Sequence, residues 1–167
     1  IITTPTAYET GKLLNIKPLQ SLGHELVTNG DFSQIGSELV TNGDFATDSN
    51  WTKSSGAVVS NGKATVTVTD GGFQYLSQGI TYVSGKKYKL TASVKGTAGK
   101  ALRFQDHASN IGGLTTGNGV VNLNGSLQNF TVFFTANSNS NVINIARSST
   151  GDYSFEVDNV SVKEVGQ

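Results

Sequence analysis

Several side chains that could bind a sugar occupy outward positions of the strand-like segments in the second half of the chain. Sugar binding usually needs an exposed aromatic ring beside amide and charged groups that form hydrogen bonds. The residues that meet this description are Lys89, Arg103, Gln105, His107 and Phe133. We therefore take these five residues as a candidate glycan-binding site. The alternative is that they belong to a solvated face or to a contact between subunits.

Residues that could cleave a bond are less well arranged. Glu156 and Asp158 alternate on one strand face, a spacing that a two-carboxylate glycosidase could use. However, outward carboxylates on an edge strand are common without any catalytic role. The two histidines, His24 and His107, lie far apart, no serine stands in a nucleophile-elbow context, and no glycine-rich loop precedes a helix. We therefore expect a protein without enzymatic activity.

The composition narrows the remaining functions. The 167 residues include no cysteine, which excludes disulfides and thiolate metal sites. The 12 basic and 12 acidic residues do not cluster into a basic stripe, so we expect no nucleic-acid partner. No apolar run reaches the ~18 residues that a membrane-spanning helix needs, so we expect no membrane insertion. Abundant Gly, Asn, Ser and Thr favour short strands joined by turns, a composition common on extracellular and virion surfaces.

The candidate residues must be held by strands, because apolar and polar side chains alternate with a period of two. In the clearest segment, 87–95, Tyr88, Leu90, Ala92 and Val94 face one way and the polar residues face the other. Short segments of this kind, separated by turn residues, predict an all-β fold, an antiparallel β-sandwich of the jelly-roll type. The predicted strands are 63–69, 73–79, 87–95, 101–107, 120–123, 128–135, 141–146 and 153–165.

The last predicted strand changes its parity. Its first apolar residues occupy odd positions up to Val157, whereas Val160 and Val162 occupy even positions. A β-bulge at Asp158 and Asn159 would bring both sets to the same face of the sheet.

One octapeptide occurs twice, thirteen positions apart. The sequence Glu25–Phe32, ELVTNGDF, returns as Glu38–Phe45, and each copy runs into an Asn-Gly-Asp turn signal. Only the second copy leads directly into the predicted strands. Either a short duplication lengthened a linker, or the first copy adds a strand to a sheet edge, of its own domain or of a neighbour. It could even take the place of the second copy in a neighbouring chain.

The pattern divides the chain into an arm, residues 1–37, and a β-sandwich domain, residues 38–167. Pro5 and Pro18 oppose a helix at both ends of the first segment. Apolar side chains in an arm need a packing partner, which is the arm's own domain, another copy of the chain or a different protein. We expect this assembly role for Tyr8, Leu13, Leu14, Ile16, Leu19, Leu26 and Val27.

Three motifs in order resemble a known fold family. They are Thr41–Phe45 followed by Trp51, then Gly85–Gly96, and finally Phe155–Val162. Over roughly 38–165 the chain resembles the galactose-binding-like jelly rolls of carbohydrate-binding modules, of the type in families four, nine and twenty-two. The segment 4–13, with Thr-Pro-Thr-Ala-Tyr followed by Gly-Lys-Leu, resembles the opening of some bacteriophage virion proteins that carry such jelly rolls.

The resemblance implies a sandwich of eight to ten strands, glycan binding on a concave sheet face and, in many members, a structural calcium ion. The implied calcium ligands are Asn42, Gly43, Asp44 and Asp158, completed by backbone carbonyls. Ala46 stands where many members have a further acidic residue. Alternatively, Asp44 is a turn residue that bonds its own backbone and Asp158 belongs to the bulge. Trp51 is expected to pack on the core more readily than on a sugar.

These expectations combine into one function and one alternative. We expect a non-enzymatic structural protein of a virion, as a capsid decoration or a tail or fibre appendage, or of another surface assembly. Its arm would anchor it by self-association or by contact with other structural proteins, and its sandwich would adhere to glycans. The alternative is a stand-alone secreted carbohydrate-binding module attached to a polysaccharide-degrading system. Both place the protein on a virion surface or outside the cell.

Overall fold

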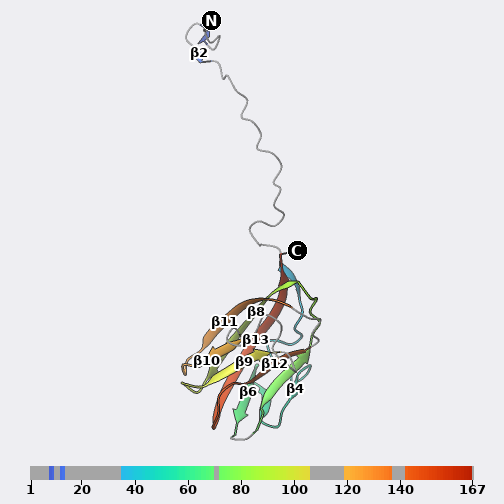
Figure 1. Ribbon diagram of the computed structural model, residues 1–167, viewed down its shortest axis with the longest axis vertical. Coiled ribbons are helices and arrows are strands. Elements are labelled where there is room, and N and C mark those ends of the chain that lie inside the picture. Colours follow the sequence, from blue (N-terminus) through green and yellow to red (C-terminus); the bar gives the residue numbers. More distant parts are fainter. Residues whose placement is uncertain are drawn as a thin grey trace.

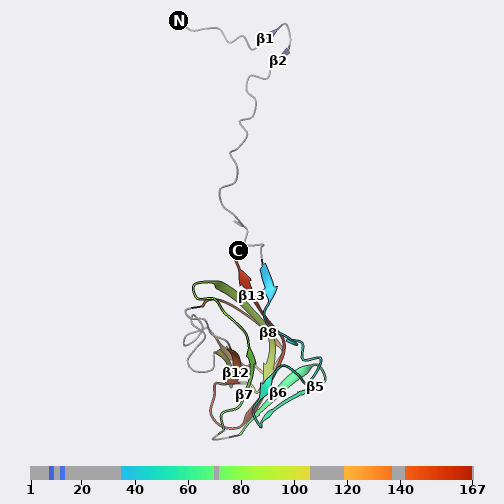
Figure 2. The same ribbon diagram turned by 90° about the vertical axis from the view of Figure 1, so that its right-hand side faces the viewer.

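The computed structural model describes residues 35–69, 72–105, 119–136 and 142–166, together with the backbone of two short strands at 8–9 and 12–13. Within these residues two antiparallel sheets pack face to face (Figure 1, Figure 2). The predicted all-β sandwich is therefore confirmed. The described residues include no helix with the length and hydropathy needed to cross a membrane.

The six-stranded sheet has the strand order β11-β8-β13-β6-β5, and β3 pairs with β13 beside it. The longest strand, β13, pairs with β8 along one edge and with β6 and β3 along the other. The bounds are β3 Ile35–Glu38, β5 Ala57–Ser60, β6 Lys63–Val68, β8 Lys87–Gly96, β11 Gln128–Thr135 and β13 Tyr153–Val165. Figure 2 shows β3 and the end of β13 side by side at one end of the sandwich.

The five-stranded sheet has the strand order β10-β9-β12-β7-β4. Its central strand, β12, pairs antiparallel with β7 on one side and β9 on the other. The bounds are β4 Thr52–Lys53, β7 Tyr75–Gly79, β9 Ala101–Gln105, β10 Val120–Asn122 and β12 Val142–Arg147.

The core lies between the sheets and is filled by the apolar positions of each alternating strand. In β8 the four predicted inward residues are all buried, whereas Lys87 and Lys95 at its ends are exposed. In β11, Phe130, Val132 and Phe134 pack on the core, and Phe133 is exposed on the other face, as predicted. The alternation therefore assigned these strand faces correctly.

The bulge predicted in the last strand is present. The pairing of β13 with β8 shifts register between Asp158 and Ser161, and Asn159 has a φ of 51°. Val157, before the shift, and Val160, after it, are both buried in the same core. The extra residue therefore keeps the apolar side chains of this thirteen-residue strand on one face.

Two features near the start of the sandwich differ from the predictions. The first strand, β3, ends at Glu38, so only the first residue of the second repeat copy is in a strand, and Ile35–Ser37 belong to the sheet although the pattern assigns them to the arm. The short strands β4, with two residues, and β5, with four, were not predicted.

Most of the arm lies outside the described residues. Its described part is the pair of strands β1 (Tyr8–Glu9) and β2 (Lys12–Leu13), in which Tyr8 is the partner of Leu13. The other expected assembly residues lie outside the described residues, as does the first repeat copy, so their role remains a prediction. These residues are Leu14, Ile16, Leu19, Leu26 and Val27.

Tyr153 connects the two sheets through its hydroxyl group. The hydroxyl donates to the carbonyl oxygen of Ala101 (2.8 Å) and accepts from the backbone N–H groups of Ser148 (3.0 Å) and Ser149 (3.2 Å). We expect Tyr153→Phe to lower the free energy of unfolding by about 1 kcal/mol, because the Ser149 N–H loses its bond to the hydroxyl while Ser148 and Ala101 stay bonded to each other. Urea unfolding measures this loss. Thr131→Val, at an exposed site on β11, serves as the control, and an equal change in both variants would contradict this role.

Candidate functional site

The structure divides the five predicted glycan-binding residues between two opposite faces. Lys89 and Phe133 are register partners on the outer face of the six-stranded sheet. Arg103 and Gln105 lie on β9 in the five-stranded sheet. His107 lies outside the described residues. The five residues therefore do not form one surface, because strand alternation shows which side chains face outward but not which sheet the strand joins.

The face with Lys89 and Phe133 is apolar and basic. The Lys89 ammonium nitrogen lies 5.8 Å from the centroid of the Phe133 ring, and Phe133 is 62% exposed. Together with Ile35, Lys87 and Val165, these residues line an open groove of about 450 Å³. The groove lies beside β3, where the chain enters the sandwich.

The outer face of the five-stranded sheet brings together a different set of side chains. One row of register partners runs from Gln105 on β9 through Asn144 on β12 to Ser77 on β7. The neighbouring row runs from Arg103 through Ala146 to Tyr75 on the same three strands. Residues two apart on a strand share a face, so the two rows form one continuous surface.

Two aromatic rings and a guanidinium group cluster at one side of this surface. The rings of Phe73 and Tyr75 have centroids 5.7 Å apart with an interplanar angle of 34°. The Arg103 Cζ atom lies 5.8 Å from the Phe73 ring centroid. Ala146, between Arg103 and Tyr75 in the row, is small and fully buried, which lets the long Arg103 side chain cross β12 toward Phe73. Phe73 is 46% exposed, so this cluster is open to solvent.

Two buried polar atoms of the same surface have no hydrogen-bond partner in the part of the chain that the structure describes. They are the Asn144 Oδ1, an acceptor on a side chain only 2% exposed, and the Arg103 Nε, a donor. Leaving such groups unpaired is unfavourable, and native structures contain few of them. Both atoms are closed off from solvent, so a ligand would reach them only after the covering side chains move. A hydroxyl group could then donate to the Asn144 oxygen, and a hydroxyl or carboxylate oxygen could accept from the Arg103 nitrogen.

The charged residues in the described strands of this sheet are all basic. Its described strands contain Lys53, Arg103 and Arg147 and no acidic residue. Lys53 is paired with Asp48 of the preceding loop. The six-stranded sheet instead carries Glu38, Glu156, Asp158 and Glu164. Among the described strands, the five-stranded sheet is therefore the one on which an anionic ligand meets no carboxylate.

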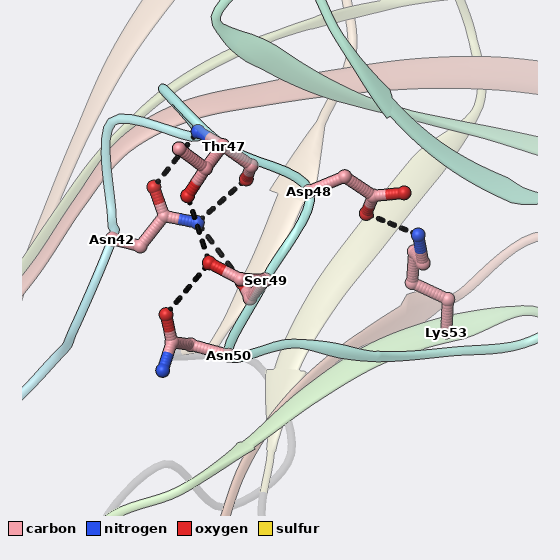
Figure 3. Close-up of polar contacts among 6 residues, drawn as sticks. All are labelled: Asn42, Thr47, Asp48, Ser49, Asn50 and Lys53. Carbon is pink, nitrogen blue, oxygen red and sulfur yellow. Dashed lines mark hydrogen bonds and ion pairs between the residues drawn. The ribbon is translucent and has the colours of Figure 1, made fainter.

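The loop implied as a calcium site is closed by its own amide group (Figure 3). The Asn42 Nδ2 donates to the carbonyl oxygens of Thr47 (2.8 Å) and Ser49 (2.9 Å), and its Oδ1 accepts from the N–H of Thr47 (3.3 Å). This pattern fixes the amide orientation, because only the nitrogen can donate to two carbonyls. The amide nitrogen therefore stands between two carbonyl oxygens that could otherwise ligate a cation.

The two aspartates of the implied site bond to their own neighbours. The Asp44 Oδ1 accepts from the N–H of Ala46 (3.3 Å), and the Asp158 carboxylate accepts from the backbone N–H and the side chain of Asn159 (2.6 and 2.9 Å). Asp158 lines a depression of about 140 Å³ on the six-stranded sheet that residues 42–44 do not line. The backbone of the opening loop meets the last strand where the N–H of Val160 donates to the Gly43 carbonyl oxygen (2.8 Å).

These residues do not fit a calcium ion as they are arranged. The described part of the chain contains no group of three or more His, Cys, Asp or Glu side chains that could hold a metal. Calcium needs six to eight oxygen ligands, and here the Asn42 amide nitrogen holds the Thr47 and Ser49 carbonyl oxygens in the place a cation would take. The alternative interpretation, a turn aspartate and a bulge aspartate, describes the observed bonding.

Other residues singled out from the sequence have structural contacts. Trp51 is buried, packs against Phe45 with tilted rings whose centroids are 5.1 Å apart, and donates from its Nε1 to the Asn42 carbonyl oxygen (3.0 Å). Glu156 forms an ion pair of 2.7 Å with Lys63, so it is a bound carboxylate of the surface. A hydrogen bond from Lys86 to Glu164, supported by their charges, raises the pKa of Lys86 above its usual value.

Four residues of this surface were not predicted as candidate site residues from the sequence: Phe73, Tyr75, Ser77 and Asn144. Their signal was present, because the odd positions of the predicted strand 73–79 place the first three residues on one face. Asn144 is the single polar residue among the apolar residues of 142–146, an unusual position for a strand whose other face is in the core. What the sequence lacked was the pairing of β7, β12 and β9.

Comparison with solved structures identifies the fold. A family 4 carbohydrate-binding module superposes with a TM-score of 0.56 and 16% identity, covering 69% of this chain and 94% of its own. The N-terminal cellulose-binding domain of Cellulomonas fimi β-1,4-glucanase C gives 0.54 and 17%, covering 71% and 90%. The chain shares the fold of carbohydrate-binding modules. The expected jelly-roll resemblance is thereby confirmed at the level of the fold.

One similar structure comes from a virus. The enzymatically active domain of tailspike protein 4 from bacteriophage CBA120 has a TM-score of 0.52 and 20% identity, over 76% of this chain and 21% of the tailspike chain. Neither a family model nor a curated protein matches this sequence.

The arrangement around Asn42 predicts that folding does not respond to calcium. We expect the melting temperature in millimolar calcium to equal that in excess chelator, because no described oxygen cluster gains a ligand. Differential scanning calorimetry at constant ionic strength tests this, with magnesium as the control for general salt effects. A calcium-specific rise in melting temperature would show that the carbonyls of the opening loop do bind the ion.

Proposed function

We propose that the sandwich is a non-catalytic glycan-binding module and that the outer face of its five-stranded sheet is the binding surface. The observation that carries this proposal is the cluster of Phe73, Tyr75 and Arg103 beside the unpartnered carbonyl of Asn144. The fold shared with carbohydrate-binding modules supports it. The similar structures with this fold are mostly binding modules, which agrees with a role without catalysis.

The chemistry of the surface suits a sugar chain. An aromatic ring offers an apolar face to the C–H side of a pyranose, and the exposed ring of Phe73 provides such a platform. The hydroxyl groups around the sugar need donors and acceptors at the edge of the ring. Arg103 supplies donors in a planar fork, and Asn144 supplies an acceptor. Gln105 and Ser77 extend the polar row across the sheet.

The charge of the surface favours polysaccharides whose sugars carry carboxylate groups. A guanidinium group binds a carboxylate through two parallel hydrogen bonds, which are stronger than neutral ones. Arg103 lies on a sheet whose described strands have no acidic side chain to repel such a ligand. A uronate-containing chain would therefore bind more tightly than a neutral glucan of the same length.

We further propose that the module is displayed by its arm on a virion or another surface assembly. The chain enters the sandwich at Ile35 and leaves it at Val165, and these residues are paired at one end of the domain. The tailspike similarity and the apolar residues of the arm support this setting. A secreted module attached to a polysaccharide-degrading system remains the alternative.

The aromatic platform yields the first binding prediction. We expect Phe73→Ala to weaken polysaccharide binding roughly tenfold, equivalent to about 1.4 kcal/mol, because the sugar loses its stacking surface. Affinity gel electrophoresis with alginate, polygalacturonate, xylan and mixed-linkage glucan measures the change. Phe133→Ala removes an exposed ring from the opposite face and should leave mobility unchanged. If Phe133→Ala abolished retardation and Phe73→Ala did not, the binding face would be the other sheet.

The guanidinium group yields a second prediction, on ligand charge. We expect Arg103→Lys to lose most of the binding to uronate polysaccharides, since an ammonium group cannot form the two-pronged contact. Binding should also weaken as sodium chloride rises, because exposed charges are screened. Isothermal titration with oligogalacturonates at two salt concentrations measures both effects. Equal binding of neutral and acidic oligosaccharides, unaffected by salt, would contradict the preference for acidic sugars while leaving glycan binding intact.

A further inference from the structure

The second copy of the repeat is attached to the sandwich by its first two residues. The Glu38 carboxylate accepts from the Ser161 hydroxyl (2.5 Å) and from the N–H of Val162 (2.8 Å). The N–H of Leu39 donates to the Val162 carbonyl oxygen (2.9 Å). These bonds hold the start of the octapeptide against β13, directly after the bulge.

The middle of the octapeptide makes equally specific contacts. The backbone N–H and carbonyl of Thr41 both bond to the side-chain amide of Gln78, each at 2.7 Å. Gly43 lies against β13 so closely that a Cβ atom there would be 1.9 Å from the carbonyl oxygen of Val160. Only glycine fits at this position. We call the groups that receive the octapeptide the docking site: Gln78, Val160, Ser161, Val162 and Trp51.

The attached segment lies at the surface of the domain. Of residues 35–45, only Val40 and Phe45 are buried, and the Phe45 ring packs on Trp51. The core strands of both sheets are paired without it. Exchange of this segment therefore requires the release of two buried side chains and a short set of hydrogen bonds, and the sheets stay intact.

Every residue that makes these contacts is present in the first copy as well. Glu25, Thr28, Gly30 and Phe32 stand where the second copy has Glu38, Thr41, Gly43 and Phe45. The correspondence begins before the octapeptide, because Leu22-Gly23 matches Ile35-Gly36 of β3 at the same spacing. A docking site that selects its occupant through these groups has no means of distinguishing the copies.

We propose that Glu25–Phe32 of the same chain can fill the docking site in place of Glu38–Phe45. The domain then has two alternative arrangements, which we call registers. In the first register Glu38–Phe45 fills the docking site, and in the second Glu25–Phe32 fills it. In the second register, residues 33–45 form a loop between Phe32 and Ala46, and the free arm is thirteen residues shorter. The contacts at the site are the same in both registers. The exchange therefore changes the reach of the arm by up to roughly 45 Å of extended chain without changing the sandwich.

The same chain is favoured over a neighbouring copy as the source of the segment. The second register closes a loop of thirteen residues that the first register does not contain, and this closure cost lowers its population, although the cost grows only with the logarithm of loop length. A short flexible tether holds the first copy at an effective concentration in the millimolar range, well above the micromolar concentration of a second chain. Register exchange is independent of glycan binding, because the docking site and the candidate face involve different residues.

Disulfide trapping tests the register directly. Because the sequence contains no cysteine, only the two introduced cysteines can form a disulfide. Ile35 on β3 is paired with Val165 on β13, and in the second register Leu22 would take the place of Ile35. A disulfide between Leu22→Cys and Val165→Cys therefore reports the second register. Ile35→Cys with Val165→Cys is the positive control. Leu19→Cys with Val165→Cys is the negative control, because its tether has a similar length but Leu19 does not correspond to Ile35 in the repeat. We expect the Leu22 pair to form an intrachain bond at least tenfold faster than the Leu19 pair. Equal rates, or disulfide-linked dimers alone, would overturn the proposal.

A melting experiment tests the same exchange without cysteines. Phe45→Asp places a carboxylate in the buried site of the second copy, and the first copy can relieve it by supplying Phe32. Phe32→Asp alone should leave the melting temperature unchanged. The double variant should melt at least about 5 °C below Phe45→Asp, because neither copy then fits. Identical melting of Phe45→Asp and the double variant would show that the first copy never replaces the second.

Discussion

The architecture depends on one backbone irregularity in β13. The bulge after Asp158 allows a single thirteen-residue strand to keep Val157 and Val160 in the same core although their sequence parity differs. Without it, one half of the strand would turn its valines to solvent. Residues 160–162 lie between the part of β13 that pairs with β6 and the part that pairs with β3, and the second repeat copy bonds to their backbone there.

The two outer faces follow from how the remaining strands divide between the sheets. The six-stranded sheet carries lysines interspersed with carboxylates, and much of its polar surface is paired within itself, as Glu156 is with Lys63. The five-stranded sheet has fewer charges, all basic within its described strands, and leaves a donor and an acceptor unpaired. A face with unused hydrogen-bonding capacity beside exposed rings is suited to a ligand, whereas a face with internal ion pairs is suited to solvent. This difference is the basis for assigning the proposed glycan site to the five-stranded sheet.

The opening loop is held together by hydrogen bonds at the place where the family resemblance implied a calcium ion. The Asn42 amide links two loop carbonyls that a cation could otherwise hold together, and Trp51 fixes the loop to the core. The loop is therefore organised by hydrogen bonds that do not depend on an ion. The same loop ends the octapeptide, so the proposed register exchange would carry an identical asparagine, glycine and phenylalanine into the same position. A repeat of identical residues preserves each of these contacts, and a diverged one would not.

The sequence by itself determined the strands from β6 to β13, their inward faces and the bulge, because a period of two in side-chain polarity is a local property of each segment. It also indicated the turn at 42–45, closed by the bond from the N–H of Phe45 to the Asn42 carbonyl, and the buried role of Trp51. Only the tertiary structure decided which strands are neighbours. That pairing separated Phe133 from Arg103 and brought Arg103 together with Phe73 and Tyr75. Strand order depends on contacts between residues distant in sequence, and alternation within one strand carries no information about them.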